Sequence, residues 1–409
     1  GTPWREVVDK IMIDLEEAAS ILPWEASEWG RVDKSVALGL KARMGLYAGS
    51  WCKFGFGRDA VKDEAQAEIY FKESAAAAKR VINESGRDLA INYKDLFTRT
   101  GQMKSDVNKE SMLFMMFSDF GDKSYHYMSL GEQCRMIGQS GRFPTQQLVD
   151  TYEMKNGKRI DEVGSGYDPK KPFISRDPRL KETVYTHHDT IIGNTGSNKM
   201  KFLMELFNPQ TKSWDETGAE KMVANLDYEG SVAQYGYVFS GVGFAWKKYN
   251  HFDDEASATP TYNIHLMRFA APVFNSIDRV RARVGMPGIL TVDPTRENSQ
   301  AKMRQIVRRE RKVELAKEAL MLFDMRRWRT GALQNAEPTY GYPLPVGVDA
   351  SKGIYPDGYE QATSDMVPSY GEPGSERDLN DIASYAKFAA KLRMRDKDRT
   401  WEDKFYLWA

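Results

Sequence analysis

Two short clusters of side chains have the residue types that bind metal ions. One comprises His187, His188 and Asp189, and the other is the run 251–255 (HFDDE). Imidazole nitrogens and carboxylate oxygens are common metal ligands. Adjacent histidines, however, point in different directions on a strand or a helix, and a solvated loop is the simpler explanation of the acidic run. The sequence therefore predicts no metal site at either cluster.

The sequence also lacks the motifs of the common catalytic sites. It has no G-x-S-x-G nucleophile elbow, no Walker A loop and no C-x-x-C pair, and these are the patterns of hydrolases, nucleotide-binding enzymes and thiol sites. Glycoside hydrolysis needs two carboxylates at a set separation, but Asp and Glu are too frequent in this chain to single out a pair. We predict no catalytic residue and no cofactor, and we interpret the chain as a binding protein.

Composition limits the classes of partner. The 409 residues carry 58 basic and 58 acidic side chains, and a net charge of zero argues against a nucleic-acid partner. No apolar run approaches the roughly 18 residues of a membrane span. The two cysteines, Cys52 and Cys134, can pair or stay free. Because the chain starts at Gly1 without a signal peptide or an initiator Met, we expect a processed or trimmed form.

The rest of the chain is organised around the stretch 299–328. It contains no Gly or Pro, and its apolar residues recur at helical spacing, which predicts one long helix that uses its apolar face for packing and not for ligand contact. The predicted face comprises Ile306, Val313, Leu315, Ala316, Ala319, Leu320, Leu322 and Phe323.

Charged residues interrupt this face at Arg309 and Glu310. A carboxylate beside a buried surface is costly unless it is paired. Arg308, Arg309 and Arg311 are therefore the expected partners of Glu310. The alternative is that these charges form a solvated face of the helix.

The run RRERKVELAKEALMLFDMRRW, residues 308–328, resembles the C-terminal signature of SusD/RagB-type proteins, which are surface glycan-binding lipoproteins of Bacteroidetes. Three further blocks resemble the family in the same order, so the resemblance spans most of the chain. It is specific for the family but not for the ligand. The blocks are 31–50 (RVDKSVALGLKARMGLYAGS), 143–160 with 173–184 (FPTQQLVDTYEMKNGKRI and FISRDPRLKETV), and 264–270 with 274–288 (IHLMRFA and FNSIDRVRARVGMPG).

Two departures from the family pattern concern helices. Family members have a preceding region with a lipidated cysteine and a helix that pairs with the helix predicted at 3–22, and this sequence lacks that region. Family members also continue the helix that 264–270 begins, whereas here Ala270 is followed at once by Ala271 and Pro272. About two helical turns and a loop are missing at that point. Either this is a true deletion, or the sequence does not represent a segment.

The resemblance implies a mainly α-helical fold. Tetratricopeptide-like helical hairpins would form an α superhelical scaffold, and the small-residue helices predicted at 31–50 and 68–83 would be one such hairpin. A loop-rich second half would contain short strands. We expect a single domain over 1–409, with the helical scaffold mainly in 1–87 and 264–330 and the loop-rich ligand-binding part mainly in 88–263 and 331–400.

Aromatic residues in predicted loops are the candidate ligand contacts. Carbohydrate binding needs flat aromatic faces against the apolar side of a sugar ring, and aromatic residues make up 12% of the chain. The competing interpretation is that each ring is a partly buried anchor of its own loop. The candidates are Trp51, Tyr125, Tyr127, Trp214, Tyr235, Tyr237 and Trp246.

The resemblance further implies a non-catalytic role at the cell surface. The protein would capture an oligosaccharide or polysaccharide at the extracellular face of the outer membrane and deliver it to a SusC-like TonB-dependent transporter. An N-terminal lipid anchor that is not present in this sequence would hold it at the membrane. RagB-type relatives handle peptides, so peptide capture for import is the alternative, and a soluble glycosidase is a third hypothesis.

Overall fold

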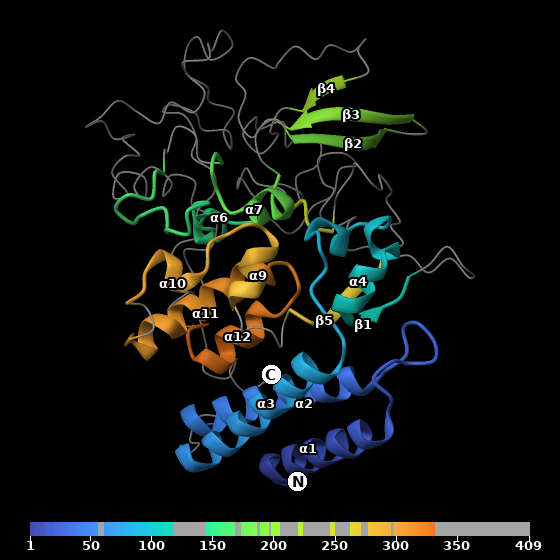
Figure 1. Ribbon diagram of the computed structural model, residues 1–409, viewed down its shortest axis with the longest axis vertical. Coiled ribbons are helices and arrows are strands. Elements are labelled where there is room, and N and C mark those ends of the chain that lie inside the picture. Colours follow the sequence, from blue (N-terminus) through green and yellow to red (C-terminus); the bar gives the residue numbers. More distant parts are fainter. Residues whose placement is uncertain are drawn as a thin grey trace.

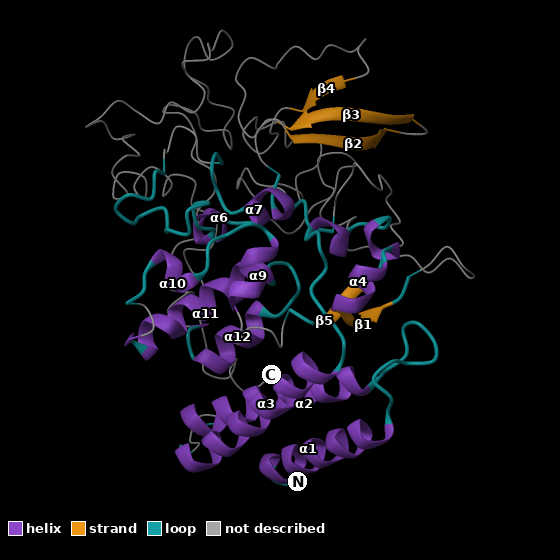
Figure 2. Cartoon of the chain, in the orientation of Figure 1, coloured by secondary structure: helices purple, strands orange, loops and turns teal. Residues whose placement is uncertain are grey.

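Helices predominate in the part of the chain that the computed structural model describes, and the strands are short (Figure 2). This part comprises residues 1–55, 61–117, 144–167, 173–185, 189–195, 198–204, 220–223, 246–249, 262–270, 277–295 and 298–331.

Three long helices lie side by side at one end of this structure (Figure 1). The side chain of Asp33 caps the second helix by accepting a hydrogen bond from the Val36 N–H over 3.0 Å, which satisfies one of the first-turn donors. Asp63 caps the third in the same way. The helices are α1 (Trp4–Ile21), α2 (Lys34–Phe54) and α3 (Glu64–Glu84).

Small residues allow α2 and α3 to pack closely. A Cβ atom on Gly45 would lie 2.8 Å from the carbonyl oxygen of Tyr70, so a larger residue would force the helices apart. Across the same contact the Ser74 hydroxyl donates a hydrogen bond to the Ala42 carbonyl over 2.6 Å. The helical hairpin predicted from the small residues of 31–50 and 68–83 is therefore confirmed.

Short helices and 3-10 turns follow the hairpin. Thr145 and Asp177 cap the two helices that the family-like blocks predict, by accepting hydrogen bonds from the N–H groups of Leu148 and Arg179. The elements are η1 (Lys94–Phe97), η2 (Gly101–Met103), α4 (Ser105–Glu110), α6 (Gln146–Thr151) and α7 (Pro178–Thr183).

The segment 264–270 is a strand and not the start of a helix, so that prediction is wrong. Strand β5 (Ile264–Arg268) pairs antiparallel with β1 (Ser111–Met115), and the pairing sets His265 opposite Phe114. A short apolar run fits a strand and a buried helix equally well by its periodicity. The pairing with β1, which lies far away in the sequence, decides between them. The helical scaffold predicted for 264–330 therefore starts after β5.

A second small sheet lies at the end of the structure opposite α1–α3 (Figure 1). Its strand order is β2-β3-β4, with an antiparallel first pair and a parallel second pair. This confirms the prediction of short strands in the second half of the chain. The strands are β2 (Asp189–Thr195), β3 (Asn198–Met204) and β4 (Glu220–Val223).

The helix predicted over 299–328 is broken in two, so the prediction of one continuous helix is wrong. In a continuous helix the Glu314 carbonyl would accept a hydrogen bond from the Glu318 N–H. Three side-chain donors take that carbonyl instead, namely Tyr93 Oη at 3.1 Å, Lys248 Nζ at 3.1 Å and Arg268 Nη2 at 2.8 Å. The last helices are α9 (Ile277–Arg283), α10 (Ile289–Val292), α11 (Gln300–Glu314) and α12 (Met321–Trp328).

The buried face of this region is narrower than predicted. Ile306, Val313, Leu315 and Ala316 are buried, as expected. Leu322, in contrast, is 44% exposed, and Ala319 is exposed as well. The break after Glu314 explains the difference, because the residues beyond it no longer follow the helical repeat of α11.

One apolar core joins the helical layer to the first sheet. Leu38 of α2 and Val81 of α3 share it with Met112 of β1 and Met267 of β5. The mainly α fold with a strand-containing second half is thus confirmed. Cys52 is buried with a free thiol, whereas Cys134 lies outside the described residues. None of the helices in the described ranges combines the length and the apolarity that a membrane span requires.

Candidate functional site

Two of the seven predicted aromatic contacts lie in the described part of the chain, Trp51 and Trp246. The other five stay predictions, because Tyr125, Tyr127, Trp214, Tyr235 and Tyr237 lie outside it. The metal-like cluster at 187–189 is described only at Asp189, and the run 251–255 is not described. Within the described residues no three His, Cys, Asp or Glu side chains are grouped as a metal site would require.

Trp51 lies in the last turn of α2 and not in a loop, so its predicted location is wrong. The helix continues to Phe54 and ends at Gly55, whose φ of +83° a side chain would disfavour. The Trp51 ring packs edge-on against Trp4 at a centroid distance of 5.6 Å. This contact favours the alternative role, in which Trp51 anchors the end of α2 on α1.

Trp246 lies on a short segment that is fixed to the scaffold. It forms an isolated antiparallel bridge with Val184, and the ammonium group of Lys317 lies 5.8 Å from the centroid of its half-buried ring. The N–H groups of Lys247 and Lys248 both donate to the carbonyl of Thr183 at the end of α7. These contacts hold the Trp246 backbone in place beside the α11–α12 connection.

A cluster of buried charges attaches this segment, strand β5 and the end of α4 to α11. It holds equal numbers of acids and bases, so each charge that leaves water has a partner. The acids are Glu110, Glu153, Asp177, Glu310, Glu314 and Glu318, and the bases are Arg179, Lys248, Arg268, Arg281, Arg283 and Arg309.

Glu314 is the centre of this cluster. Its fully buried carboxylate accepts hydrogen bonds from Arg268 at 2.7 Å, Arg283 at 2.5 Å and Arg179 at 3.0 Å. Burial alone would raise the pKa of Glu314, but the three guanidinium groups hold that pKa well below its usual range. Glu314 is therefore ionised in the folded protein.

Glu318 and Lys248 form the edge of the cluster nearest Trp246. The Lys248 ammonium donates to the Glu318 carboxylate over 2.6 Å. Although burial opposes ionisation, Arg268 and Lys248 lower the pKa of Glu318 to about 2. Burial lowers the pKa of Lys248 to about 8, and the attraction of Glu318 limits the decrease. This pair links the Trp246 segment to the turn that separates α11 from α12.

The predicted partners of Glu310 are wrong. Glu310 pairs with Arg179 at 2.5 Å and with Arg281 at 3.1 Å, whereas Arg309 pairs with Glu153 and Arg311 with Asp324. Neighbours along a helix diverge around its axis, so the run 308–311 points to several sides. The sequence correctly predicts a paired carboxylate, but the partners come from α7 and α9.

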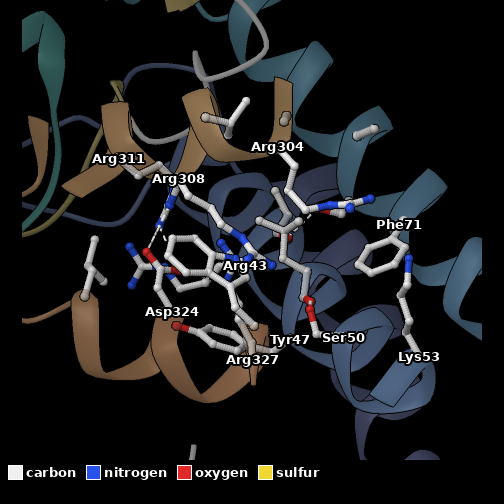
Figure 3. A pocket seen from close by; sticks show the side chains of 18 of the residues that line it. Arg43, Tyr47, Ser50, Lys53, Phe71, Arg304, Arg308, Arg311, Asp324 and Arg327 are labelled. Atoms are coloured by element: carbon white, nitrogen blue, oxygen red, sulfur yellow. Dashed lines mark hydrogen bonds and ion pairs between the residues drawn. The ribbon is translucent and has the colours of Figure 1, made fainter. Parts of the chain in front are cut away.

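A cavity of about 610 Å³ lies between the α2–α3 pair and the α11–α12 pair. Figure 3 shows arginines of α11 pointing into it from one side and Arg43, Tyr47 and Phe71 lining the other. The small residues Gly39, Ala42 and Ala75 leave room for it on the helical layer. A volume of this size is in the usual range of small-ligand sites.

The charge of the cavity lining is far from balanced. Among the described residues that line it, Asp324 is the only acid, and it is shared by Arg311 and Arg327. Burial lowers the pKa of Arg43 and of Arg327. Burial also lowers the pKa of Arg308, and the nearby Arg304 and Arg327 lower it further. The cationic residues of the lining are Arg43, Lys53, Arg304, Arg308, Arg311 and Arg327.

The sequence indicates only one side of this cavity, the side that α11 forms. The basic run of α11 is visible, and its spacing could place Arg304, Arg308 and Arg311 on adjoining faces of one helix. Arg43 and Phe71 belong to the helical hairpin and come next to α11 only in the folded chain. The sequence analysis therefore missed the cavity.

These elements define a class of protein, namely a mainly helical scaffold in which a layer of long helices packs on a strand-containing second half through an apolar core, and in which buried ion pairs attach that half to α11. The SusD family model matches residues 109–275 and 270–368, which is more than half of the chain, and the chain belongs to the SusD family. None of the curated proteins matches it significantly.

Solved structures agree in fold. A SusD-like carbohydrate binding protein from Bacteroides fragilis NCTC 9343 superposes with a TM-score of 0.62 at 20% identity, over 100% of this chain and 69% of that one. A SusD-like protein from the same strain superposes with a TM-score of 0.54 at 20% identity, over 83% of this chain and 63% of that one. The chain thus spans less than two thirds of the length of the second of these relatives.

Proposed function

We propose that this protein is a non-catalytic glycan-binding protein of the cell surface. Membership of the SusD family carries the proposal. The fold shared with a SusD-like carbohydrate binding protein is consistent with it. Aromatic residues outside the helical scaffold supply ring faces for sugars, and Trp246 is the one candidate in the described segments that lies on such a connection.

The capture step is tested by affinity electrophoresis of the pure protein in gels that contain single neutral or acidic polysaccharides. We expect weak retardation by at least one polysaccharide and no release of reducing sugar on long incubation. Sustained release of sugar by protein free of contaminating hydrolase would establish the glycosidase hypothesis instead. Peptide capture, the alternative, is tested with a peptide mixture, and binding of peptides without any glycan would replace the proposal.

Delivery to a membrane partner is the second part of the proposed function. A SusC-like TonB-dependent transporter would receive the glycan, and a lipid on a preceding segment would hold the protein at the outer membrane. One acyl chain gives only marginal attachment, so contact with the transporter would stabilise that location. Gentle solubilisation of native membranes should co-purify a large transporter with the protein, and its consistent absence would contradict this step.

A further inference from the structure

The described residues that line the cavity between α2–α3 and α11–α12 carry more positive than negative charge. The buried core of the same protein balances its acids and bases, so the surplus of cations in the cavity is a local property. Several guanidinium groups that face one another in a confined space repel one another electrostatically and lose part of their hydration, and both effects cost free energy. An anion bound among them would reduce the repulsion and replace the lost hydrogen bonds to water.

Two arginines have capacity to bind such an anion. The Nε atom of Arg308 is buried and has no hydrogen-bond partner among the described residues. Its guanidinium carbon lies 4.8 Å from the centroid of the Trp328 ring, a cation–π contact that holds the group beside the cavity wall. Arg304 extends from the same face of α11 toward Phe71 (Figure 3). It forms no ion pair with a described residue.

The remainder of the lining suits a ring that carries hydroxyl groups. Phe71 and Phe54 offer aromatic surface, and Gln300 and Ser50 offer polar atoms. Asp324 accepts hydrogen bonds from Arg327 at 2.7 Å and from Arg311 at 3.0 Å, and one carboxylate cannot balance the six cations of the described lining. Planar guanidinium groups recognise carboxylates and related oxyanions through paired N–H donors.

We propose that this cavity binds the anionic group of an acidic saccharide, a carboxylate or a sulfate on a sugar ring. The saccharide part of this proposal rests on the proposed glycan-binding function. Trp51 and Trp246, the predicted aromatic contacts among the described residues, do not line this cavity, which lies between helices that the sequence analysis assigned to packing.

The test is isothermal titration of the full chain with trigalacturonate, with its neutral methyl ester and with inorganic sulfate. We expect binding of trigalacturonate that is at least about tenfold tighter than binding of the ester, because the ester cannot form charge-assisted hydrogen bonds with guanidinium groups. Raising the salt concentration should weaken the binding of trigalacturonate but not the binding of its neutral ester. Sulfate competition would show that the anion itself is recognised.

Matched variants locate the site. Arg304→Gln and Arg308→Gln should each weaken trigalacturonate binding about fivefold to tenfold. Lys302→Gln is the control, because Lys302 is an exposed cation of the same helix that does not line the cavity. Arg304 is exposed too, so its replacement should leave the melting temperature unchanged even if Arg308→Gln unfolds the protein.

Several results would overturn the inference. Equal affinity for the acid and its ester, or unchanged affinity in both arginine variants, would exclude an anion site in this cavity. If the anion site is excluded in this way but the protein still binds neutral glycans, the proposed glycan-binding function is unaffected. Binding of an acidic peptide of equal charge, with no acidic saccharide bound, would overturn the saccharide class.

Discussion

Glu314 shows at the residue scale how the buried charges stabilise this fold. Three arginines from three elements converge on one carboxylate that has no contact with solvent. An ion pair in the interior need not be more stable than an apolar pair, but removal of one partner leaves the others uncompensated. The stability of the protein therefore depends on keeping the cluster complete.

Replacement of Glu314 by Gln should lower the free energy of unfolding by about 3–5 kcal/mol, because it leaves buried arginines without their counter-charge. Urea denaturation measures the change. Glu68→Gln removes an exposed i,i+4 ion pair with Lys72 and is the control, with an expected change of less than about 0.5 kcal/mol. Equal effects of the two variants would contradict the assigned role of Glu314.

His265 makes stability depend on pH above the range in which carboxylates titrate. The imidazole is buried between Ser111 Oγ and Tyr249 Oη, and burial lowers its pKa to about 3. In the unfolded chain the imidazole of His265 binds a proton near pH 6.5, whereas in the folded chain it stays neutral at that pH. The contribution of His265 to the free energy of unfolding is therefore complete above pH 6.5 and is lost as the pH falls toward 3.

We expect the free energy of unfolding to fall by up to about 1.4 kcal/mol per pH unit below pH 6.5. A second loss should begin below the ordinary glutamate pKa of 4.5, because Glu318 has a folded pKa of about 2 and stabilises only while ionised. Denaturation curves from pH 7 to 4 measure the first loss. The variant His265→Gln should lack it and keep the second, and equal slopes of the wild type and the variant between pH 6.5 and 5 would contradict the assignment.

The break between α11 and α12 is the main feature at the scale of elements. Ala319 has a φ of +59°, a left-handed conformation that costs a non-glycine residue about 1–2 kcal/mol. The break persists because Glu314, at the end of α11, binds Arg268, and Glu318, within the turn, binds Arg268 and Lys248. Strain in the turn is therefore offset by the buried ion pairs.

Ala319→Gly should stabilise the protein by about 1 kcal/mol, because glycine adopts positive φ without strain and Ala319 buries no side chain. Ala76→Gly in α3 is the matched control, since Ala76 is exposed within a regular helix and its replacement should destabilise by about 1 kcal/mol. Thermal unfolding of both variants gives the signs. Destabilisation by Ala319→Gly would indicate that this turn is not left-handed in solution.

Local patterns predicted the elements whose causes are local. The caps of α2, α6 and α7 and the close α2–α3 contact follow from Asp33, Thr145, Asp177 and a run of small residues. Features fixed by distant partners were not predictable in this way. The donors that end α11, the strand that pairs with β5 and the arginine that faces α11 from α2 all come from far away in the sequence.

At the scale of the whole molecule, the two charged regions have different consequences. The balanced cluster attaches the second half of the chain to α11, and its described acids and bases are equal in number. The described lining of the cavity beside α11 carries six cations and one acid, Asp324, which pairs with Arg311 and Arg327. A glycan that stacks on Trp246 and an anionic group held in this cavity would therefore contact different parts of one protein.

Trp51 and Trp246 allow the predicted aromatic contacts to be tested against their anchoring alternative. Trp51→Ala should cost roughly 2–4 kcal/mol of stability, because the ring packs on Trp4, and should leave glycan affinity unchanged. Trp246→Ala should change stability less, since its segment is also held through Lys248 and Thr183. It should weaken glycan binding by about 1–3 kcal/mol if its ring stacks on a sugar as aromatic rings stack on bases.

The same pair of measurements, melting temperature and ligand titration, extends to Tyr125, Tyr127, Trp214, Tyr235 and Tyr237. Replacement of a residue that contacts the glycan should lower the affinity and leave the melting temperature unchanged. Replacement of an anchor should lower the melting temperature and leave the affinity unchanged, because one ring surface cannot pack against both a sugar and the protein core. If none of the seven variants weakens binding without unfolding the protein, the aromatic assignment is wrong. Loss of binding in Arg304→Gln alone would then place the glycan in the cavity between α2 and α11.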